Sequence, residues 1–169
     1  MNHHHLPAGV ETCHWGFFDA TLPPVLTVAS GDTVTIDTVS GGPDVLPPDE
    51  FHVPPELLDI HARSERMLPG HILTGPVAVE GAEPGDVLEV RIEDVALRQD
   101  WGYNFHRPLA GTLPDDFPEP HGANIPLDLE RNTGRLPWGL ELPLAPFFGV
   151  MGAAPPPAWR RITQLHQVD

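Results

Sequence analysis

Proline is the residue that most restricts the fold of this chain. There are 22 prolines among 169 residues, and they are spread along the whole sequence. A proline lacks the backbone N–H donor that regular structure uses, and its ring disrupts the interior of a helix. This distribution argues against extensive helix and predicts short strands joined by long, ordered loops.

Between the prolines, apolar and polar residues alternate with the period of two that is typical of strands with one buried side. In SGDTVTIDT, Val34 and Ile36 fall on one face. In DVLEVRIED, Leu88, Val90 and Ile92 do the same. Turn-forming residues separate such segments. We therefore expect strands near 25–29, 33–38, 76–81, 86–94, 125–130 and 136–142.

Two local signals complete the expected secondary structure. Glu83-Pro84-Gly85-Asp86 predicts a type II turn, because proline presets φ at its second position and glycine accepts a positive φ at its third. Pro55 is a suitable first residue for a helix, and apolar residues follow it at helical spacing. We expect one short helix near 55–66 and no other.

The fold class that follows is mainly β, a sandwich or barrel-like assembly with long proline-rich loops and one short helix. No change in composition marks a linker, so we expect a single β-rich domain over 1–169. The segment 146–155, PFFGVMGAAP, is expected to be buried. One more strand is expected to begin within WRRITQLHQVD.

The charge balance restricts the possible partners. Nine basic residues against 24 acidic ones give a formal net charge of −15. Nucleic acid and anionic membranes are therefore poor partners. The acidity is explained most simply as a surface property that keeps the protein in solution.

Cysteine content and the N-terminal sequence bear on the compartment. Cys13 is the only cysteine, so the chain has no internal disulfide and no cysteine-rich zinc site. The start of the chain lacks the basic and apolar regions of a signal peptide, and no apolar run approaches the roughly 20 residues that cross a membrane. We expect a cytoplasmic protein without a membrane span.

Ten histidines among 24 carboxylates make a metal site the first chemistry to consider. A hydrolytic metal site needs about three protein ligands and an open position for water. No pair has the short spacing of HExxH, so distant strands would have to assemble the site. His71 is the preferred histidine, because it precedes a Thr-Gly-Pro turn that can fix an imidazole. The run at positions 3–5, a native feature or the remnant of a tag, receives no catalytic weight.

Asp37 is the preferred carboxylate. It lies at the end of an expected strand, directly before a Gly-Gly-Pro loop, where it could bind a metal or act as a general base. The alternative is an ordinary solvent-exposed residue, because alternation places it opposite the apolar face. The neighbours Cys13 and His14 point to opposite faces of an extended strand, so they do not form a thiol–imidazole pair with each other. No substrate-binding residue is predicted.

Several long blocks resemble the acetamidase/formamidase family, in the same order and along nearly the whole chain. They are CHWGFFDATLPPVLTVASGDTVTIDTVSGGPDVLPP, GHILTGPVAVEGAEPGDVLEVRI, LRQDWGYN and IPLDLERNTGRLPWGLELPLAPFFGVMGAAPPP. Asp37 matches a position where the family has an acidic residue. His71 stands just before the family's Thr-Gly-Pro, at a position where related sequences vary.

The resemblance implies a β-rich amidohydrolase that converts short linear amides, such as formamide or acetamide, to carboxylate and ammonia. It also implies a divalent metal, with zinc as the expected ion, and a homo-oligomer in the complete protein. Asp37 and His71 are then the expected metal ligands, with Asp37 also the catalytic carboxylate. The chain resembles the N-terminal half of a member, because two later family blocks are absent. The alternative is a truncated, non-catalytic β domain that retains only the scaffold.

Overall fold

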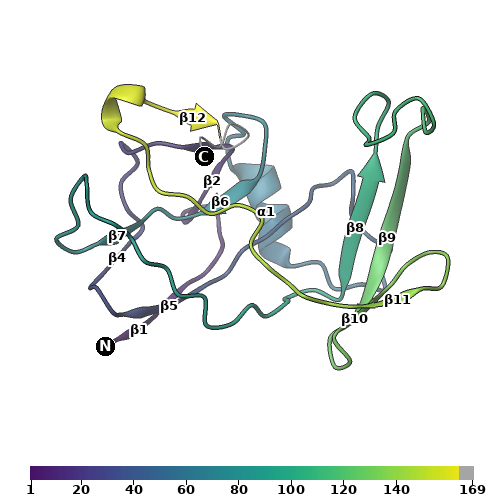
Figure 1. Ribbon diagram of the computed structural model, residues 1–169, viewed down its shortest axis with the longest axis horizontal. Coiled ribbons are helices and arrows are strands. Elements are labelled where there is room, and N and C mark those ends of the chain that lie inside the picture. Colours follow the sequence, from purple (N-terminus) through teal and green to yellow (C-terminus); the bar gives the residue numbers. More distant parts are fainter. Residues whose placement is uncertain (164–169) are drawn as a thin grey trace. The chain divides into compact units, whose positions relative to one another are not determined.

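The computed structural model describes residues 1–163, and short strands dominate it (Figure 1). About 27% of the chain is strand and 7% is helix, which confirms the mainly β class with one short helix. None of the helices among the described residues has the length and apolar character that crossing a membrane requires. The chain forms two compact units, each described by itself below. The single domain and the sandwich or barrel-like arrangement stay predictions.

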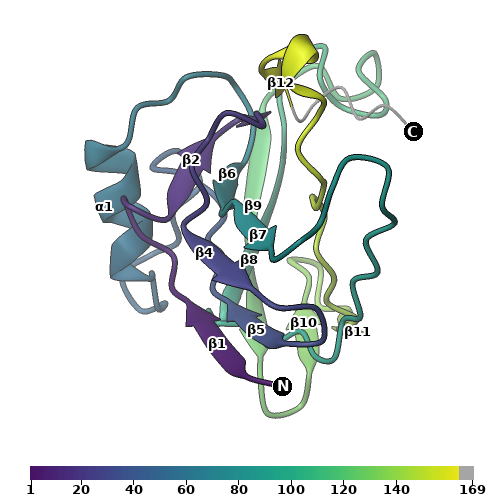
Figure 2. The same ribbon diagram turned by 90° about the vertical axis from the view of Figure 1, so that its left-hand side faces the viewer.

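The first unit comprises Met1–Ser40, Pro55–Ile92 and the chain from Phe148 on. Its strands form four separate pairs, two parallel and two antiparallel, and Figure 2 shows β1 beside β5 and β4 beside β7. The parallel pairs are β1 (His3–Leu6) with β5 (Thr33–Ile36) and β4 (Leu26–Val28) with β7 (Val77–Val79). The antiparallel pairs are β2 (Cys13–Trp15) with β6 (Ile72–Thr74) and β3 (Phe17–Phe18) with β12 (Ile162–Thr163).

The helix α1 (Pro55–Arg63) contributes to the core of this unit. Leu57 and Ile60 are fully buried, as apolar residues three apart on one helical face should be. Trp15 is buried as well, its ring meets His61 of the helix edge-on at 4.7 Å, and its indole N–H donates to the Gly70 carbonyl at 3.0 Å. The helix therefore packs through one face, and the prediction of a helix near 55–66 is confirmed. A 3₁₀ turn at Pro157–Trp159 (η1) is the second helical element described.

The second unit comprises Gly41–Pro54 and Glu93–Phe147. It contains a four-stranded antiparallel sheet in the order β11-β10-β9-β8. Its core residue is Trp101, which is buried and donates its indole N–H to the His52 carbonyl at 2.8 Å. The strands are β8 (Trp101–His106), β9 (His121–Asp128), β10 (Thr133–Arg135) and β11 (Glu141–Pro143).

The turn at 83–86 forms as predicted. The Asp86 amide donates to the Glu83 carbonyl at 3.1 Å, and Gly85 has a φ of 106°. The strands expected near 25–29, 33–38, 76–81 and 125–130 are also present, in slightly different bounds, as β4, β5, β7 and β9. β12 confirms the strand expected near the end of the chain.

The strand expected at 86–94 is not formed. Leu88, Val90 and Ile92 are 61%, 53% and 55% exposed, and within residues 1–163 no strand pairs with this segment. A strand needs a hydrogen-bonded neighbour as well as a suitable pattern, and the alternation cannot supply that neighbour.

Two other expectations are wrong. Only residues 141 and 142 of the strand expected at 136–142 are in a strand, β11. Before them the Gly139 amide donates to the Leu136 carbonyl at 2.9 Å and closes a turn between β10 and β11. The segment 146–155 is mostly exposed rather than buried, with Phe147 at 81% and Met151 at 56%. Apolar composition alone does not provide a surface against which such a segment can pack.

Candidate functional site

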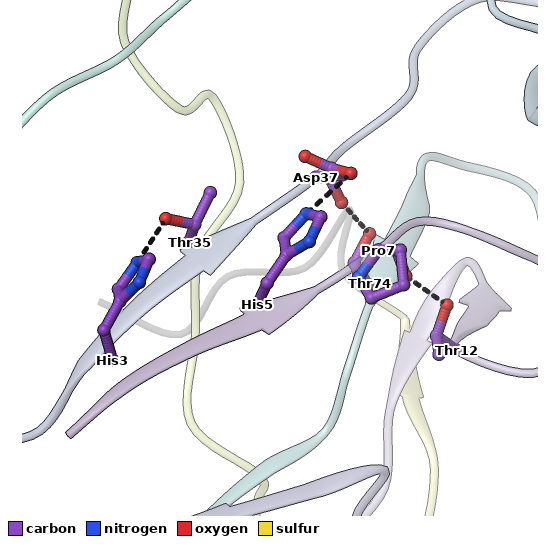
Figure 3. A network of polar contacts seen from close by, with 7 residues as sticks. All are labelled: His3, His5, Pro7, Thr12, Thr35, Asp37 and Thr74. Atoms are coloured by element: carbon purple, nitrogen blue, oxygen red, sulfur yellow. Dashed lines mark hydrogen bonds and ion pairs between the residues drawn. The ribbon is translucent and has the colours of Figure 1, made fainter.

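A row of polar side chains lies along one face of the β1–β5 pair (Figure 3). The two strands are parallel and pair His3 with Thr33 and His5 with Thr35. Alternation places the first and third histidines of β1 on the face that carries Thr35 and Asp37. His3 Nε2 lies 2.8 Å from Thr35 Oγ1. The His3 side chain therefore contacts the residue two positions after its register partner, Thr33.

The central pair of this row is His5 with Asp37. His5 Nε2 lies 3.0 Å from Asp37 Oδ2, a hydrogen bond that becomes an ion pair when the imidazole is protonated. The Asp37 side chain is 20% exposed and that of His5 is 56% exposed. His5 therefore orients the carboxylate, and one-fifth of the Asp37 side chain is exposed to solvent.

The backbone of Asp37 is held from two elements. Its amide donates to the Leu6 carbonyl of β1 at 2.9 Å, and its carbonyl accepts from the Thr74 hydroxyl of β6 at 2.9 Å. Cys13 Sγ lies 3.5 Å from the same hydroxyl. Asp37 thus lies at the end of β5, where β1 and β6 fix its position.

The structure places His71 directly before β6, three residues from Thr74. Its backbone oxygen accepts from the Gly16 amide at 3.0 Å, and its side chain is exposed. The histidine that the structure brings to the Asp37 carboxylate is His5. The roles predicted for His71 as a ligand, and for Asp37 as a ligand and catalytic carboxylate, stay predictions.

The opposite face of β1 carries a second histidine–carboxylate pair. His4 Nε2 lies 3.0 Å from Asp32 Oδ2, and the Asn2 amide donates to Asp32 Oδ1 at 2.7 Å. The Asn2 amide, together with His4, holds the pKa of Asp32 far below its usual range. This carboxylate stays ionised at neutral pH and joins the start of β1 to the turn before β5.

His14 is enclosed by backbone oxygens. Its Nδ1 lies 3.2 Å from the Gly75 carbonyl oxygen, and its Nε2 lies 3.0 Å from the Phe17 carbonyl oxygen. Burial lowers the pKa of His14, against the opposing effect of the two carbonyls. A neutral imidazole donates to one of these oxygens. Both ring nitrogens lie close to backbone carbonyl oxygens. That Cys13 and His14 do not form a thiol–imidazole pair stays a prediction.

The described residues do not complete a metal centre. Over residues 1–163, no group of three or more histidine, cysteine, aspartate and glutamate side chains is placed to hold a metal ion. His5 and Asp37 offer one nitrogen and one carboxylate, which is fewer than the three ligands of a hydrolytic zinc site. The implied metal therefore does not fit the described residues as a complete site.

Sequence reasoning overlooked His5, because a run of three histidines is easily attributed to a tag. Two features of the sequence could have identified His5. His3 and His5 are two apart, so they share one face of a strand, and SGDTVTIDT offers polar partners with the same spacing. What the sequence could not show is that the two segments pair in parallel.

The comparisons with known proteins agree with this architecture. A sequence model of the acetamidase/formamidase family matches residues 8–165. The formamidase of Methylophilus methylotrophus is 50% identical in an alignment 54 positions long, which covers 29% of this chain and 13% of that protein. The acetamidase of Mycolicibacterium smegmatis is 33% identical in an alignment 107 positions long, which covers 56% of this chain and 26% of that protein.

A solved structure shares the fold. The acetamidase of Bacillus halodurans superposes with a TM-score of 0.60 at 24% identity, over 94% of this chain and 48% of that one. The chain thus spans about half the length of that acetamidase. Since the family pattern matches nearly all of the sequence, the chain belongs to the acetamidase/formamidase family.

Proposed function

We propose that the complete protein hydrolyses short linear amides, such as formamide and acetamide, to the carboxylate and ammonia. Family membership supports this proposal, as do the names of two relatives, a formamidase and an acetamidase. The matched segments span 13% and 26% of those relatives. The activity is therefore proposed for a protein of the relatives' length.

The observation that carries the proposal at the level of residues is the Asp37 carboxylate, oriented by His5 at 3.0 Å and still accessible. In the proposed reaction, Asp37 takes a proton from water as the water oxygen adds to the amide carbonyl carbon. It then returns the proton to the amide nitrogen, the C–N bond breaks, and ammonia leaves. His5 is a positioning residue that holds the carboxylate. His71, directly before β6, is proposed as a metal ligand.

A divalent metal, with zinc as the expected ion, belongs to the same proposal. When bound, such an ion would polarise the carbonyl or lower the pKa of a water molecule. Asp37 and His71 are its proposed ligands, and His5 is a further donor beside Asp37. Residues 1–163 do not supply a three-ligand group placed to hold this ion.

The test is ammonia release from formamide and acetamide by the protein at the length of its relatives. Asp37→Ala should lower kcat at least about 10²-fold, the low end for the loss of a general base. His5→Gln should lower the rate less and change its pH profile, because it acts through Asp37.

Asp86→Asn is the matched control, since Asp86 is an exposed turn residue whose carboxylate accepts the Glu83 amide at 2.9 Å. It should keep normal turnover and change stability by about 1 kcal/mol at most. Normal turnover in Asp37→Ala would contradict the assignment of Asp37 and return it to the role of an exposed strand residue.

The second candidate function is a non-catalytic domain that retains only the scaffold. The lack of a three-ligand group within residues 1–163 favours this function for the chain by itself. The 169-residue chain should then release essentially no ammonia from either amide. Chelator-resistant ammonia release by this chain would contradict both the metal dependence and the assignment of this chain as a non-catalytic domain.

We also propose that the complete protein is a cytoplasmic homo-oligomer that acts on a small amide and binds neither nucleic acid nor membranes. The single free thiol of Cys13 and the strongly acidic composition support this setting. Sedimentation of the full-length protein would measure the assembly.

A further inference from the structure

Strand β8 ends and strand β9 begins at the same end of their hairpin, where the connecting segment joins them (Figure 1). Each strand carries a histidine at this point. β8 ends at His106, β9 begins at His121, and the antiparallel register pairs them directly. Directly opposed residues have Cβ atoms about 4.5–5.5 Å apart. The two imidazole rings have centroids 6.0 Å apart and are tilted by 36°. The pair belongs to the second unit and shares no residue with the Asp37 site.

Strand alternation separates this pair from the aromatic residues of β8. Tyr103 and Phe105 stack at 5.9 Å on one face, so His106 points to the other face, and His121 joins it there. The nearby cation Arg107 is engaged elsewhere. Its guanidinium lies 2.7 Å from Asp44 Oδ2 and 4.9 Å from the centre of the Phe105 ring.

The connecting segment 107–120 folds against His106, and its last residues, 116–120, line an open cavity beside the two histidines. Gly111 lies beside His106, and a Cβ at position 111 would be in van der Waals contact with His106 Cβ at 3.4 Å. Phe117 packs edge-on to the His106 ring at 6.1 Å. The cavity has a volume of about 520 Å³, and its lining includes both histidines and the carboxylates of Asp116 and Glu119. No lysine or arginine lines it.

This set of donors fits a particular class of ligand. Neutral imidazole suits zinc, copper and nickel, whereas Ca²⁺ and Mg²⁺ prefer sites made of oxygen ligands alone. Two imidazoles and one carboxylate, with water in the remaining position, match the ligand number of an open zinc site. The net charge of −15 also favours cations.

We propose that His106 and His121, together with a carboxylate from Asp116 or Glu119, bind a first-row transition-metal dication such as Zn²⁺. Within residues 1–163 no three donors already converge on a metal position. Binding therefore requires the two imidazole rings to turn their nitrogens towards a shared metal position. It also requires the connecting segment to bring one carboxylate, from Asp116 or Glu119, to the same position. The metal joins the hairpin end to its connecting segment and orders both. The proposal does not depend on the amidase activity.

The experiment is a Zn²⁺ titration of the 169-residue chain by calorimetry, with the histidine ring signals followed by NMR. The wild type should bind one Zn²⁺ that shifts the His106 and His121 signals. His121→Gln should weaken this binding at least about 100-fold, since supporting residues outside the ligand set already cost 10–100-fold. Asp116→Asn combined with Glu119→Gln should weaken it at least about 10-fold. Because His121 is exposed, its replacement is not expected to unfold the chain.

Two controls separate this site from other histidines. His52→Gln, an exposed histidine of the same unit, should leave the affinity unchanged. A variant with His3, His4 and His5 all replaced by Gln removes zinc binding at the N-terminal run, including the His5 donor beside Asp37. It should keep the shifts at His106 and His121. Unchanged affinity in His121→Gln would overturn the proposal, as would zinc-dependent shifts confined to His3, His4 and His5 in the wild type.

Discussion

Asp32 lies in the turn between β4 and β5, and its carboxylate contacts both the start of the chain and the turn itself. The Asn2 amide donates to Oδ1 at 2.7 Å, the Ala29 amide donates to Oδ2 at 3.2 Å, and His4 Nε2 lies 3.0 Å from Oδ2. These contacts favour the ionised carboxylate in the folded chain and lower its pKa. One ionised side chain thus joins the N-terminal strand to the β4–β5 turn.

Asp32→Asn should therefore destabilise the chain in a pH-dependent way. Because the folded pKa is depressed, the contribution of Asp32 is fully present above its unfolded value of about 3.8 and is lost as the pH falls through the folded pKa. The melting temperature of Asp32→Asn should lie below that of the wild type at pH 7, and the gap should narrow below about pH 3.8. Thermal melts of both proteins from pH 7 to pH 2.5 measure the gap. A gap that is constant with pH would contradict this account.

Gly16 is required by space as well as by conformation. Its φ is 87°, and a Cβ there would overlap the carbonyl group of Leu68. Gly81 has a similar φ of 73° but open space around it. Gly16→Ala should lower the free energy of unfolding by about 3 kcal/mol, whereas Gly81→Ala should cost only about 1 kcal/mol of backbone strain. Urea denaturation of both variants tests this, and equal losses would show that the Leu68 contact is unimportant.

At the scale of elements, the segment 87–92 shows that a strand pattern is not sufficient for a strand. Its apolar residues alternate correctly, yet more than half of each of the Leu88, Val90 and Ile92 surfaces is exposed. Val28 on β4 is buried at 7% exposure, because β4 is paired with β7. The two valines differ in their neighbours, not in their local pattern.

This contrast predicts different costs for the same substitution. Val28→Ala should lower the free energy of unfolding by about 2 kcal/mol, the range for losing buried methyl groups. Val90→Ala should change it by less than about 0.5 kcal/mol, as is usual for exposed positions. Chemical denaturation of the 169-residue chain measures both. A large loss in Val90→Ala would show that the segment is packed in solution.

At the scale of the whole molecule, many large apolar side chains of the described residues are exposed to solvent. The exposed apolar side chains include those of Val87, Leu88, Val90, Ile92, Phe147 and Met151. Unpaired strand-like segments and apolar patches invite association. The superposition with a solved acetamidase covers only 48% of that protein.

The purified 169-residue chain should therefore self-associate or bind a hydrophobic dye. Val90→Lys places a charge within the exposed segment 87–92 and should reduce both effects without lowering the melting temperature. Light scattering and dye fluorescence at matched protein concentrations provide the measurement. A monodisperse monomer that melts cooperatively and ignores the dye would show that the chain is self-contained.

The sequence by itself determined the features that depend on neighbouring residues. The turn at 83–86 forms because Pro84 and Gly85 have the required φ preferences, and α1 begins at Pro55 because proline suits a first helical turn. The mainly β class follows from alternation between prolines. These signals are local, so they hold before any tertiary contact forms.

Only the tertiary structure decided which segments found partners. β1 pairs with β5 about 30 residues away, and this parallel register brings His5 to Asp37. The register of β8 and β9 likewise sets His106 against His121. The segment 87–92 has the better strand pattern, yet it remains unpaired within residues 1–163. A strand is stabilised by the hydrogen bonds and side chains of its neighbour, and no local pattern encodes which distant segment that neighbour will be.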